Sequence, residues 1–289
     1  VQETCRQYVL CNCILEQKPG YRESEVALLC SSKRKLYVLL IDGTCDGSGT
    51  SLRLMGCHRI EDVREVLVGL GLQVVRVYVE KGAAYLFITR SIEKSRQLLC
   101  ILDFFDSCAI KDNCSLRSLE QVQVDLFESH ICGGSKVSMF QYSMVLFWCN
   151  NMEEDLWLSR SLFVLGGQLL VCTEDFMQFG PLSEDASSSP YFLLDSCCSI
   201  IDVSEMVIEP GEILCVTLAI ACTTSEFCPS DKADKVKEDA SLTKEKPASG
   251  PMTWKLKWFS EDSLFKFATL LKAIHGGRTT SPLLVRCIS

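Results

Sequence analysis

Residues 57–71, CHRIEDVREVLVGLG, recur in diverged form as residues 197–211, CCSIIDVSEMVIEPG. The two stretches align without a gap, whereas an arbitrary offset would give roughly one identity by chance. Six positions are identical, namely Cys57/Cys197, Ile60/Ile200, Asp62/Asp202, Val63/Val203, Glu65/Glu205 and Gly71/Gly211. A match of this kind predicts a duplicated structural unit.

The segments that follow the repeated stretch also correspond. Each copy continues with an apolar strand, at 72–79 and 212–220, and then a strand in which large residues alternate. Each second strand leads to a serine, Ser91 or Ser260, placed as the N-cap of a helical pattern. The sequence His275-Gly276-Gly277 predicts the end of the second helix.

The segments that precede the repeated stretch correspond as well. Hairpin patterns include LYVLLID at 36–42 and LLVCTED at 169–175, the second after the turn pair Gly166-Gly167. Opening strands are predicted at 7–15 and 141–149. Each copy therefore predicts about six or seven strands closed by one C-terminal helix.

This order predicts an α+β, mostly β chain built from two modules. Module 1 covers 1–106, a connector covers 107–140 as a short helix or extended segment, and module 2 covers 141–289. Residues 223–250 are rich in Lys, Glu, Ser and Pro and poor in large apolar residues, so we expect a disordered insertion there. One large β-sandwich with stray helices is the alternative architecture.

The composition is that of a folded chain, with 47% hydrophobic and 23% charged residues. The 18 cysteines fall mainly in apolar strand-like runs, where a reduced thiol packs as a small apolar group. Their spacings suit neither a disulfide framework nor a zinc site, so we expect reduced thiols, no metal and a cytoplasmic protein. No apolar run is long enough to span a bilayer. The start, VQETCRQ, suggests a piece of a longer protein.

The charge distribution argues against nucleic acid as a partner. Residues 141–223 hold one basic side chain, Arg160, and 12 acidic ones, whereas residues 1–106 hold 14 basic and 13 acidic ones. Phosphate backbones are bound by clustered cations, which the block 141–223 lacks. Its acidic strip is either a solvated face or an acidic docking surface.

A module of about seven strands capped by one helix resembles pleckstrin-homology (PH) domains. The resemblance implies two PH-like β-barrels or sandwiches in tandem, each capped by a C-terminal helix. The helix tryptophan typical of that family is absent from 92–106 and from 260–276. Strings such as GCHRIEDVREVLVGLGLQVVRVYVE are similar to the C-terminal region of leucine-rich-repeat scaffold proteins of the nischarin and serine/threonine-kinase-interacting protein type. This resemblance implies an adaptor in cytosolic signalling or endomembrane traffic.

One basic cluster, Lys33-Arg34-Lys35, lies at a predicted hairpin tip. Three exposed cations could contact an anionic lipid for about 1 kcal/mol each, and a solvated turn is the alternative interpretation. In module 2 the acidic stretch at 153–155 makes lipid binding unfavourable.

The sequence predicts no enzyme and no cofactor. None of the common nucleophile, zinc-protease or phosphate-loop motifs is present, and only three histidines occur, at His58, His130 and His275. His58 is replaced by Cys198 in the second copy. The repeated carboxylates at 62, 65, 202 and 205 indicate a shared turn or cap.

Two functional hypotheses follow. The first is a non-catalytic scaffold that binds protein partners through sheet edges or the groove beside the helix. The alternative is a peripheral membrane module in which Lys33, Arg34 and Lys35 of module 1 bind anionic lipid or phosphoinositide. We expect a cytoplasmic location, peripheral to membranes if the alternative holds.

Overall fold

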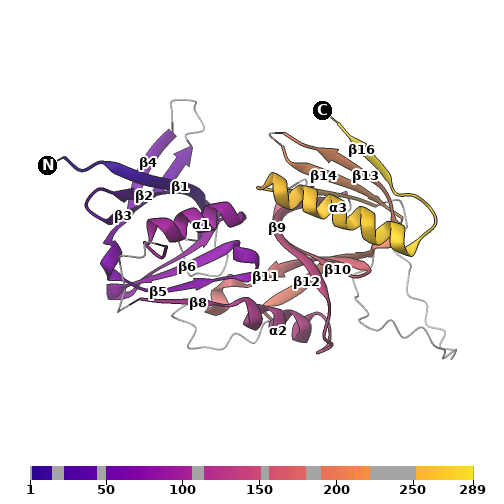
Figure 1. Cartoon of the computed structure of the whole chain (residues 1–289), viewed down its shortest axis with the longest axis horizontal. Helices are drawn as coiled ribbons and strands as arrows, with labels where there is room; N and C mark the ends of the chain where they lie inside the picture. Colours follow the sequence, from indigo (N-terminus) through magenta and orange to yellow (C-terminus); the bar gives the residue numbers. More distant parts are fainter. Residues whose placement is uncertain are drawn as a thin grey trace. The chain divides into compact units, whose positions relative to one another are not determined.

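The computed structural model of the chain describes residues 2–14, 23–43, 50–105, 114–150, 156–179, 190–211, 213–221 and 252–288. The predicted insertion at 223–250 lies outside these residues. The described part is mostly β, with two eight-stranded sheets and three α-helices (Figure 1).

The first sheet contains the strands of module 1 and one strand from the predicted connector. Its order is β4-β3-β2-β1-β7-β6-β5-β8. The elements are β1 (Cys5–Ile14), β2 (Glu23–Ser31), β3 (Lys35–Gly43), β4 (Thr50–Arg59), β5 (Val63–Val68), β6 (Val74–Val79), β7 (Ala83–Ile88), α1 (Ile92–Ile101) and β8 (Ser115–Ser118).

The second sheet has the same order, β12-β11-β10-β9-β15-β14-β13-β16. Its elements are β9 (Met139–Cys149), β10 (Leu158–Leu165), β11 (Gln168–Glu174), β12 (Phe192–Ser199), β13 (Val203–Glu209), β14 (Cys215–Ile220), β15 (Met252–Lys257), α3 (Glu261–Arg278) and β16 (Leu284–Cys287). Helix α2 (Glu120–His130) precedes this sheet in the chain. The predicted duplication is therefore confirmed strand for strand.

The prediction of closed barrels was wrong. Among the described residues the end strands β4 and β8 are not paired with each other, and neither are β12 and β16. Each module is an open sheet that folds around its own core, and the single-sandwich alternative is excluded because no sheet runs through both copies. An eighth strand lies at the edge of β5 or β13 instead.

The repeated stretch forms the corner of each sheet. It ends β4 or β12, makes one short 3-10 turn, Ile60–Asp62 or Ile200–Asp202, and starts the next strand. Ile60 and Ile200 are fully buried, and Val63 and Val203 almost fully. A register shift follows at the same place in both copies, between Val63 and Glu65 and between Val203 and Glu205. The shared residues thus specify a shared chain reversal.

The repeated glutamates hold the eighth strand, which the sequence did not predict. β8 runs parallel to β5, and the Arg117 side chain donates to a carboxylate oxygen of Glu65, with Nε 2.8 Å away. β16 runs parallel to β13, and Arg286 forms an ion pair with Glu205. The carboxylates at 65 and 205 thus pair with the added strand, and the 3-10 turns before them have no side-chain cap.

The helix ends agree with the sequence in part. Ser91 caps α1, since its hydroxyl accepts a hydrogen bond from the Lys94 amide. Ser260 occupies the N-cap position of α3 without a side-chain cap. The predicted stop at His275-Gly276-Gly277 was wrong, because α3 continues to Arg278. Arg278, the last residue of α3, lies against Gly167. A Cβ atom at position 167 would lie 2.6 Å from a guanidinium nitrogen of Arg278.

The chain divides into two compact units. One contains Val1–Val124 with Phe176–Ser188, and the other contains Asp125–Asp175 with Ser189–Ser289. The boundary falls inside α2, so its C-terminal half, with Phe127, belongs to the second unit. No helix among the described residues is long and apolar enough to cross a membrane.

Candidate functional site

The outer face of strands β1–β4 carries an unusual set of exposed apolar residues. Alternate residues of these strands, such as Val9, Leu28 and Val38, point into the core. The residues between them form two cross-strand rows on the opposite face. The first row is Tyr8, Leu29, Tyr37 and Cys57, and the second is Leu10, Ala27, Leu39 and Leu54.

Strands β1 and β4 carry the exposed side chains of this surface, while those on β2 and β3 are half-buried or, at Ala27, buried. Tyr8 is 64% exposed and Leu54 57%, and Leu10 is also exposed. Leu52, paired with Ile41 beside the second row, is 59% exposed. Monomeric proteins seldom leave contiguous apolar side chains uncovered, and such patches usually mark binding sites. We call this surface, formed by the two rows with Ile41 and Leu52, the open face.

Module 2 has the same two rows in the same register. The first is Tyr142, Phe163, Leu170 and Cys197, and the second is Met144, Ser161, Cys172 and Leu194. Even the register shift next to the second row recurs, at Val38/Leu39 and at Val171/Cys172. The rows are therefore equivalent positions of the duplicated fold.

In module 2 this face is covered by the C-terminal half of α2. The Phe127 ring stacks on Phe163 with centroids 4.0 Å apart, and meets Phe192 edge-on at 5.7 Å. The backbone amide of Phe192 also donates to Nδ1 of His130, 3.4 Å away. Consequently Tyr142 is only 8% exposed, against 64% for its counterpart Tyr8. We call this surface the covered face.

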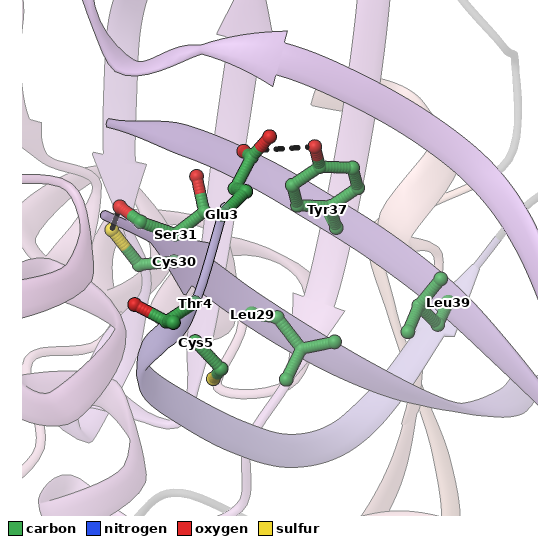
Figure 2. Close-up of a pocket in the computed structure, with 8 residues that line it drawn as sticks. All are labelled: Glu3, Thr4, Cys5, Leu29, Cys30, Ser31, Tyr37 and Leu39. Carbon is green, nitrogen blue, oxygen red and sulfur yellow. Dashed lines mark hydrogen bonds between the residues drawn. The ribbon is translucent and has the colours of Figure 1, made fainter. Parts of the chain in front are cut away.

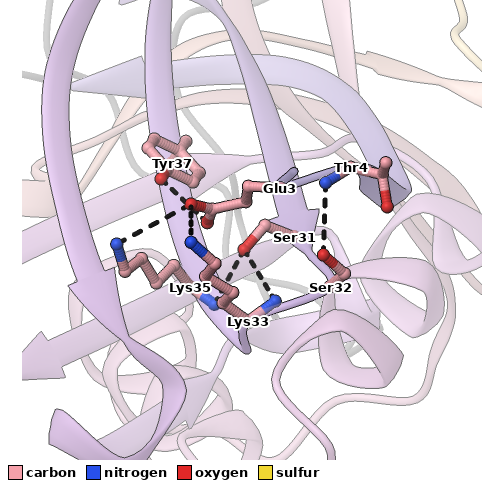
Figure 3. A network of polar contacts seen from close by, with 7 residues as sticks. All are labelled: Glu3, Thr4, Ser31, Ser32, Lys33, Lys35 and Tyr37. Carbon is pink, nitrogen blue, oxygen red and sulfur yellow. Dashed lines mark hydrogen bonds and ion pairs between the residues drawn. The ribbon is translucent and has the colours of Figure 1, made fainter. Parts of the chain in front are cut away.

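A polar network borders the open face at the end near the β2–β3 turn (Figure 3). The Tyr37 hydroxyl donates to a carboxylate oxygen of Glu3 over 3.0 Å. The ammonium groups of Lys33 and Lys35 lie 3.7 and 3.8 Å from the same carboxylate. Ser31 accepts hydrogen bonds from the backbone amides of both lysines. The hydrogen bond from Ser31 lowers the pKa of Glu3. The hydrogen bond from Tyr37 and the positive charges of Lys33 and Lys35 lower it further.

A pocket of about 300 Å³ lies between this network and the open face (Figure 2). Glu3 and Tyr37 line its polar side, and Leu29, Leu39 and Cys5 line its apolar side. The hydrogen bond to Glu3 raises the pKa of Tyr37 to about 12, so this hydroxyl stays protonated at neutral pH. The pocket therefore offers an apolar surface, a phenol and an anchored carboxylate, which suit binding rather than proton transfer.

The structure divides the predicted basic cluster. Lys33 and Lys35 face Glu3, while the Arg34 guanidinium turns away to Glu61 at 2.9 Å and Asp103 at 2.6 Å. Arg34 has a left-handed backbone, φ 56°, at the hairpin tip, which aims its side chain away from the two lysines. Each predicted cation thus has a carboxylate of its own module, and the sequence did not reveal these partners because they are distant in the chain.

Two further cations lie at this end of the open face. Arg59 stands directly opposite Lys35 on β4, and Arg6 is exposed on β1. Neither makes an ion pair with any residue that the structure describes. The open face was not predicted from the sequence, although the alternating leucines of SLRLM at 51–55 indicate an apolar strand face.

In the described part of the chain, no cluster of His, Cys, Asp and Glu side chains is arranged to hold a metal ion. His58 Nε2 lies 2.6 Å from the Tyr85 hydroxyl, and burial lowers the pKa of His58. Burial raises the pKa of Cys11 and Cys13 to about 12, which disfavours the reactive thiolate form.

By sequence, the chain matches no protein-family profile and no curated protein. Solved structures that it is similar to include one on the structural role of the PH and C1 domains of the Vav1 exchange factor. That match has a TM-score of 0.30 and 11% identity and covers 64% of this chain but only 39% of the other. Another is the hSac2 domain of human phosphoinositide phosphatase Sac2, with a TM-score of 0.28 and 16% identity over 41% of this chain and 77% of that one.

Proposed function

We propose that this chain is a non-catalytic protein-interaction scaffold made of two PH-like modules, in which the open face of module 1 is the docking surface. The adaptor role in cytosolic signalling or endomembrane traffic is part of the same proposal. What supports it is one observation: in equivalent rows of one duplicated sheet, Tyr8 and Leu10 are exposed in module 1, whereas their counterparts Tyr142 and Met144 are buried in module 2.

The physical argument is the free energy of apolar surface. Removing a large apolar side chain from water contributes about 1.5–3 kcal/mol. The exposed members of the open face lie on β1 and β4 and are joined across the rows by the half-buried Leu29, Tyr37 and Leu39, whereas isolated surface leucines elsewhere need no explanation. A partner that covers Tyr8, Leu52 and Leu54 together gains this contribution several times over.

The proposal is tested by affinity capture from cell extract, with identification by mass spectrometry. Leu52→Glu should abolish capture of the proteins that the parent chain retains, because the charge disrupts the docking surface without entering the core. Leu193→Glu is the matched control, since Leu193 is a leucine of similar exposure, 51%, on strand β12. Equal capture by the parent and by Leu52→Glu would disprove the assignment of this face.

The membrane alternative uses Lys33, Arg34 and Lys35 as its cations. Their pairing with Glu3, Glu61 and Asp103 leaves less charge for an anionic lipid. Flotation with anionic vesicles separates the two proposals. Salt-sensitive binding that is lost in the triple alanine variant of residues 33–35 would favour the membrane module over the scaffold.

A further inference from the structure

The covered face shows what kind of segment fits this surface. Helix α2 presents Phe127 to the row residue Phe163, while Cys132, just beyond the helix, is also buried. The exposed positions of α2 carry the polar residues Glu120, Gln121, Asp125, Ser129 and His130 together with Val122, so its exposed side is mainly polar and acidic at its N-terminal end. The duplicated sheet thus accepts the C-terminal half of an α-helix, anchored by an aromatic side chain that contacts β10 and β12.

The shapes of the two faces correspond position by position. Tyr8 and Leu29 stand where Tyr142 and Phe163 stand, and Leu52 stands where Phe192 stands. Phe163 and Phe192, the two rings that clasp Phe127, are thus replaced by aliphatic residues of smaller volume. The open face therefore leaves room for an aromatic side chain from outside at the place of Phe127.

The charges indicate the polar character of that helix. In the described residues from 2 to 59, strands β1–β4 and their turns carry Arg6, Lys33, Arg34, Lys35, Arg53 and Arg59 against Glu3, Glu23, Glu25 and Asp42. At the end near the β2–β3 turn, Glu3 is the carboxylate that Lys33 and Lys35 contact. Arg34 there is paired with Glu61 and Asp103. Its hydrogen bond lowers the pKa of Glu61, and the charge of the nearby Arg59, opposite Lys35, lowers that pKa further. Carboxylates from a partner would complement this end.

We propose that the open face binds an amphipathic helix of a partner protein, with an aromatic residue at its centre and acidic residues toward Lys35 and Arg59. This proposal rests on the scaffold function and specifies its partner. The acidic residues dock beside the Tyr37–Glu3 network, and the apolar stripe covers the two rows. Glu25 and Asp42 lie exposed at the opposite end of these strands, where an anionic membrane would be repelled.

The test measures fluorescence polarisation of labelled peptides of about 18 residues, five helical turns, against the full 289-residue chain. One peptide has a Leu/Phe stripe and a Glu-rich polar face, a second has Lys in place of Glu, and a third is a scrambled version of the first. We expect the acidic helix to bind at least about tenfold more tightly than either control, a difference of about 1.4 kcal/mol.

Variants of the chain locate the site. Leu54→Glu should weaken binding of the acidic helix by at least about tenfold, whereas the control Leu193→Glu should leave it unchanged. The double variant Lys35→Glu/Arg59→Glu should reverse the preference in favour of the Lys peptide. Far-UV circular dichroism of each variant verifies that its sheets are retained.

Several results would overturn the proposal: no binding of any helix, equal binding of the acidic and Lys peptides, or undiminished binding by Leu54→Glu. Flotation on anionic vesicles without peptide binding would assign the face to a membrane. Dimerisation that Leu54→Glu abolishes, measured by analytical ultracentrifugation, would assign it to a second copy of the chain. If the peptides fail while extract capture still requires Leu52, the scaffold function stands and its partner is not a helix.

Discussion

The covered face of module 2 and the open face of module 1 share the same strand register but differ in solvent exposure. Tyr142 and Tyr8 occupy the same place in the first row, yet their exposures are 8% and 64%. Around Tyr142 the chain supplies a polar partner as well as a helix, since the tyrosine hydroxyl donates to Glu174 over 2.6 Å. Tyr8 has neither. A duplicated fold can thus keep its backbone while one copy becomes an internal interface and the other remains available.

One pair of equivalent residues shows how the two faces differ in side-chain chemistry. Glu174 is buried on the covered face and accepts hydrogen bonds from Tyr142, Ser161 and Tyr191. A carboxylate is tolerated there only because these partners satisfy it. The equivalent residue on the open face is Ile41. An apolar residue needs no partner in the free chain and gains from any apolar surface that covers it.

The most disruptive test asks whether the two cores are independent. Val63→Asp places a charge at a position that is 1% exposed, and a buried unpaired charge costs several kcal/mol against a total stability of about 5–15 kcal/mol. We expect calorimetry to show two transitions in the parent and loss of the module 1 transition alone in the variant. Val203→Asp should remove the other. Loss of both transitions in either variant would show that the copies fold as one unit.

The next largest effect distinguishes the two faces directly. Phe127→Ala removes a fully buried ring that two phenylalanines contact, so it should lower the free energy of unfolding of module 2 by about 3–5 kcal/mol. Tyr8→Ala, on the open face, should change module 1 by no more than about 0.5 kcal/mol. Urea denaturation measures both. Equal costs would mean that Tyr8 is covered in solution.

The fold was largely predictable from the repeated stretch. Its identities fix a buried corner, with Ile60 and Val63 in one copy and Ile200 and Val203 in the other, and strong local signals such as Gly166-Gly167 and Ser91 fix a turn and a cap. The eighth strand was not predictable, because SLRS at 115–118 is short and wholly exposed and has no apolar alternation. Its position depends on backbone hydrogen bonds to β5, a strand that is distant from it in the sequence.

The candidate site was harder to predict for a related reason. Lys33 and Lys35 were recognised as a basic cluster, but their electrostatic partner Glu3 lies some 30 positions earlier and no local pattern joins them. The open face was missed because alternation predicts a strand with two faces and does not say whether a neighbour covers the second. Leu54 and Leu194 are the same residue at equivalent positions, and only the helix packed on module 2 separates their roles.

A smaller effect tests whether the eighth strands are equivalent. Glu65→Gln and Glu205→Gln remove ion pairs to Arg117 and Arg286, whose side chains are largely exposed, so each should cost at most about 1 kcal/mol. The local effect should be clearer. Amide hydrogen exchange should accelerate at Leu119 in the first variant and at Ile288 in the second, since these amides donate to Val68 and Ile208 at the ends of the added strands. Exchange that is unchanged in both would show that backbone pairing alone holds β8 and β16.

The smallest effect concerns pH, and at the position of His58 and Cys198 it should appear in module 1 alone. Burial lowers the pKa of His58 below its ordinary value near 6.5, so the folded state disfavours the protonated ring. The unfolded chain then binds more protons than the folded one below about pH 6.5, and the stability of module 1 should fall as pH decreases through that range. Module 2 has Cys198 at this position, and burial raises the pKa of that thiol far above its ordinary value, so it stays neutral throughout. Denaturation curves between about pH 7.5 and 5.5 should show a steeper decline in the stability of module 1 than of module 2. The control variant His58→Gln should remove this difference. Histidine proton resonances should place the titration midpoint of His58 below that of an ordinary histidine. A midpoint above 6.5 would contradict this, because it would mean that the nearby Asp62, which favours the protonated ring, outweighs burial.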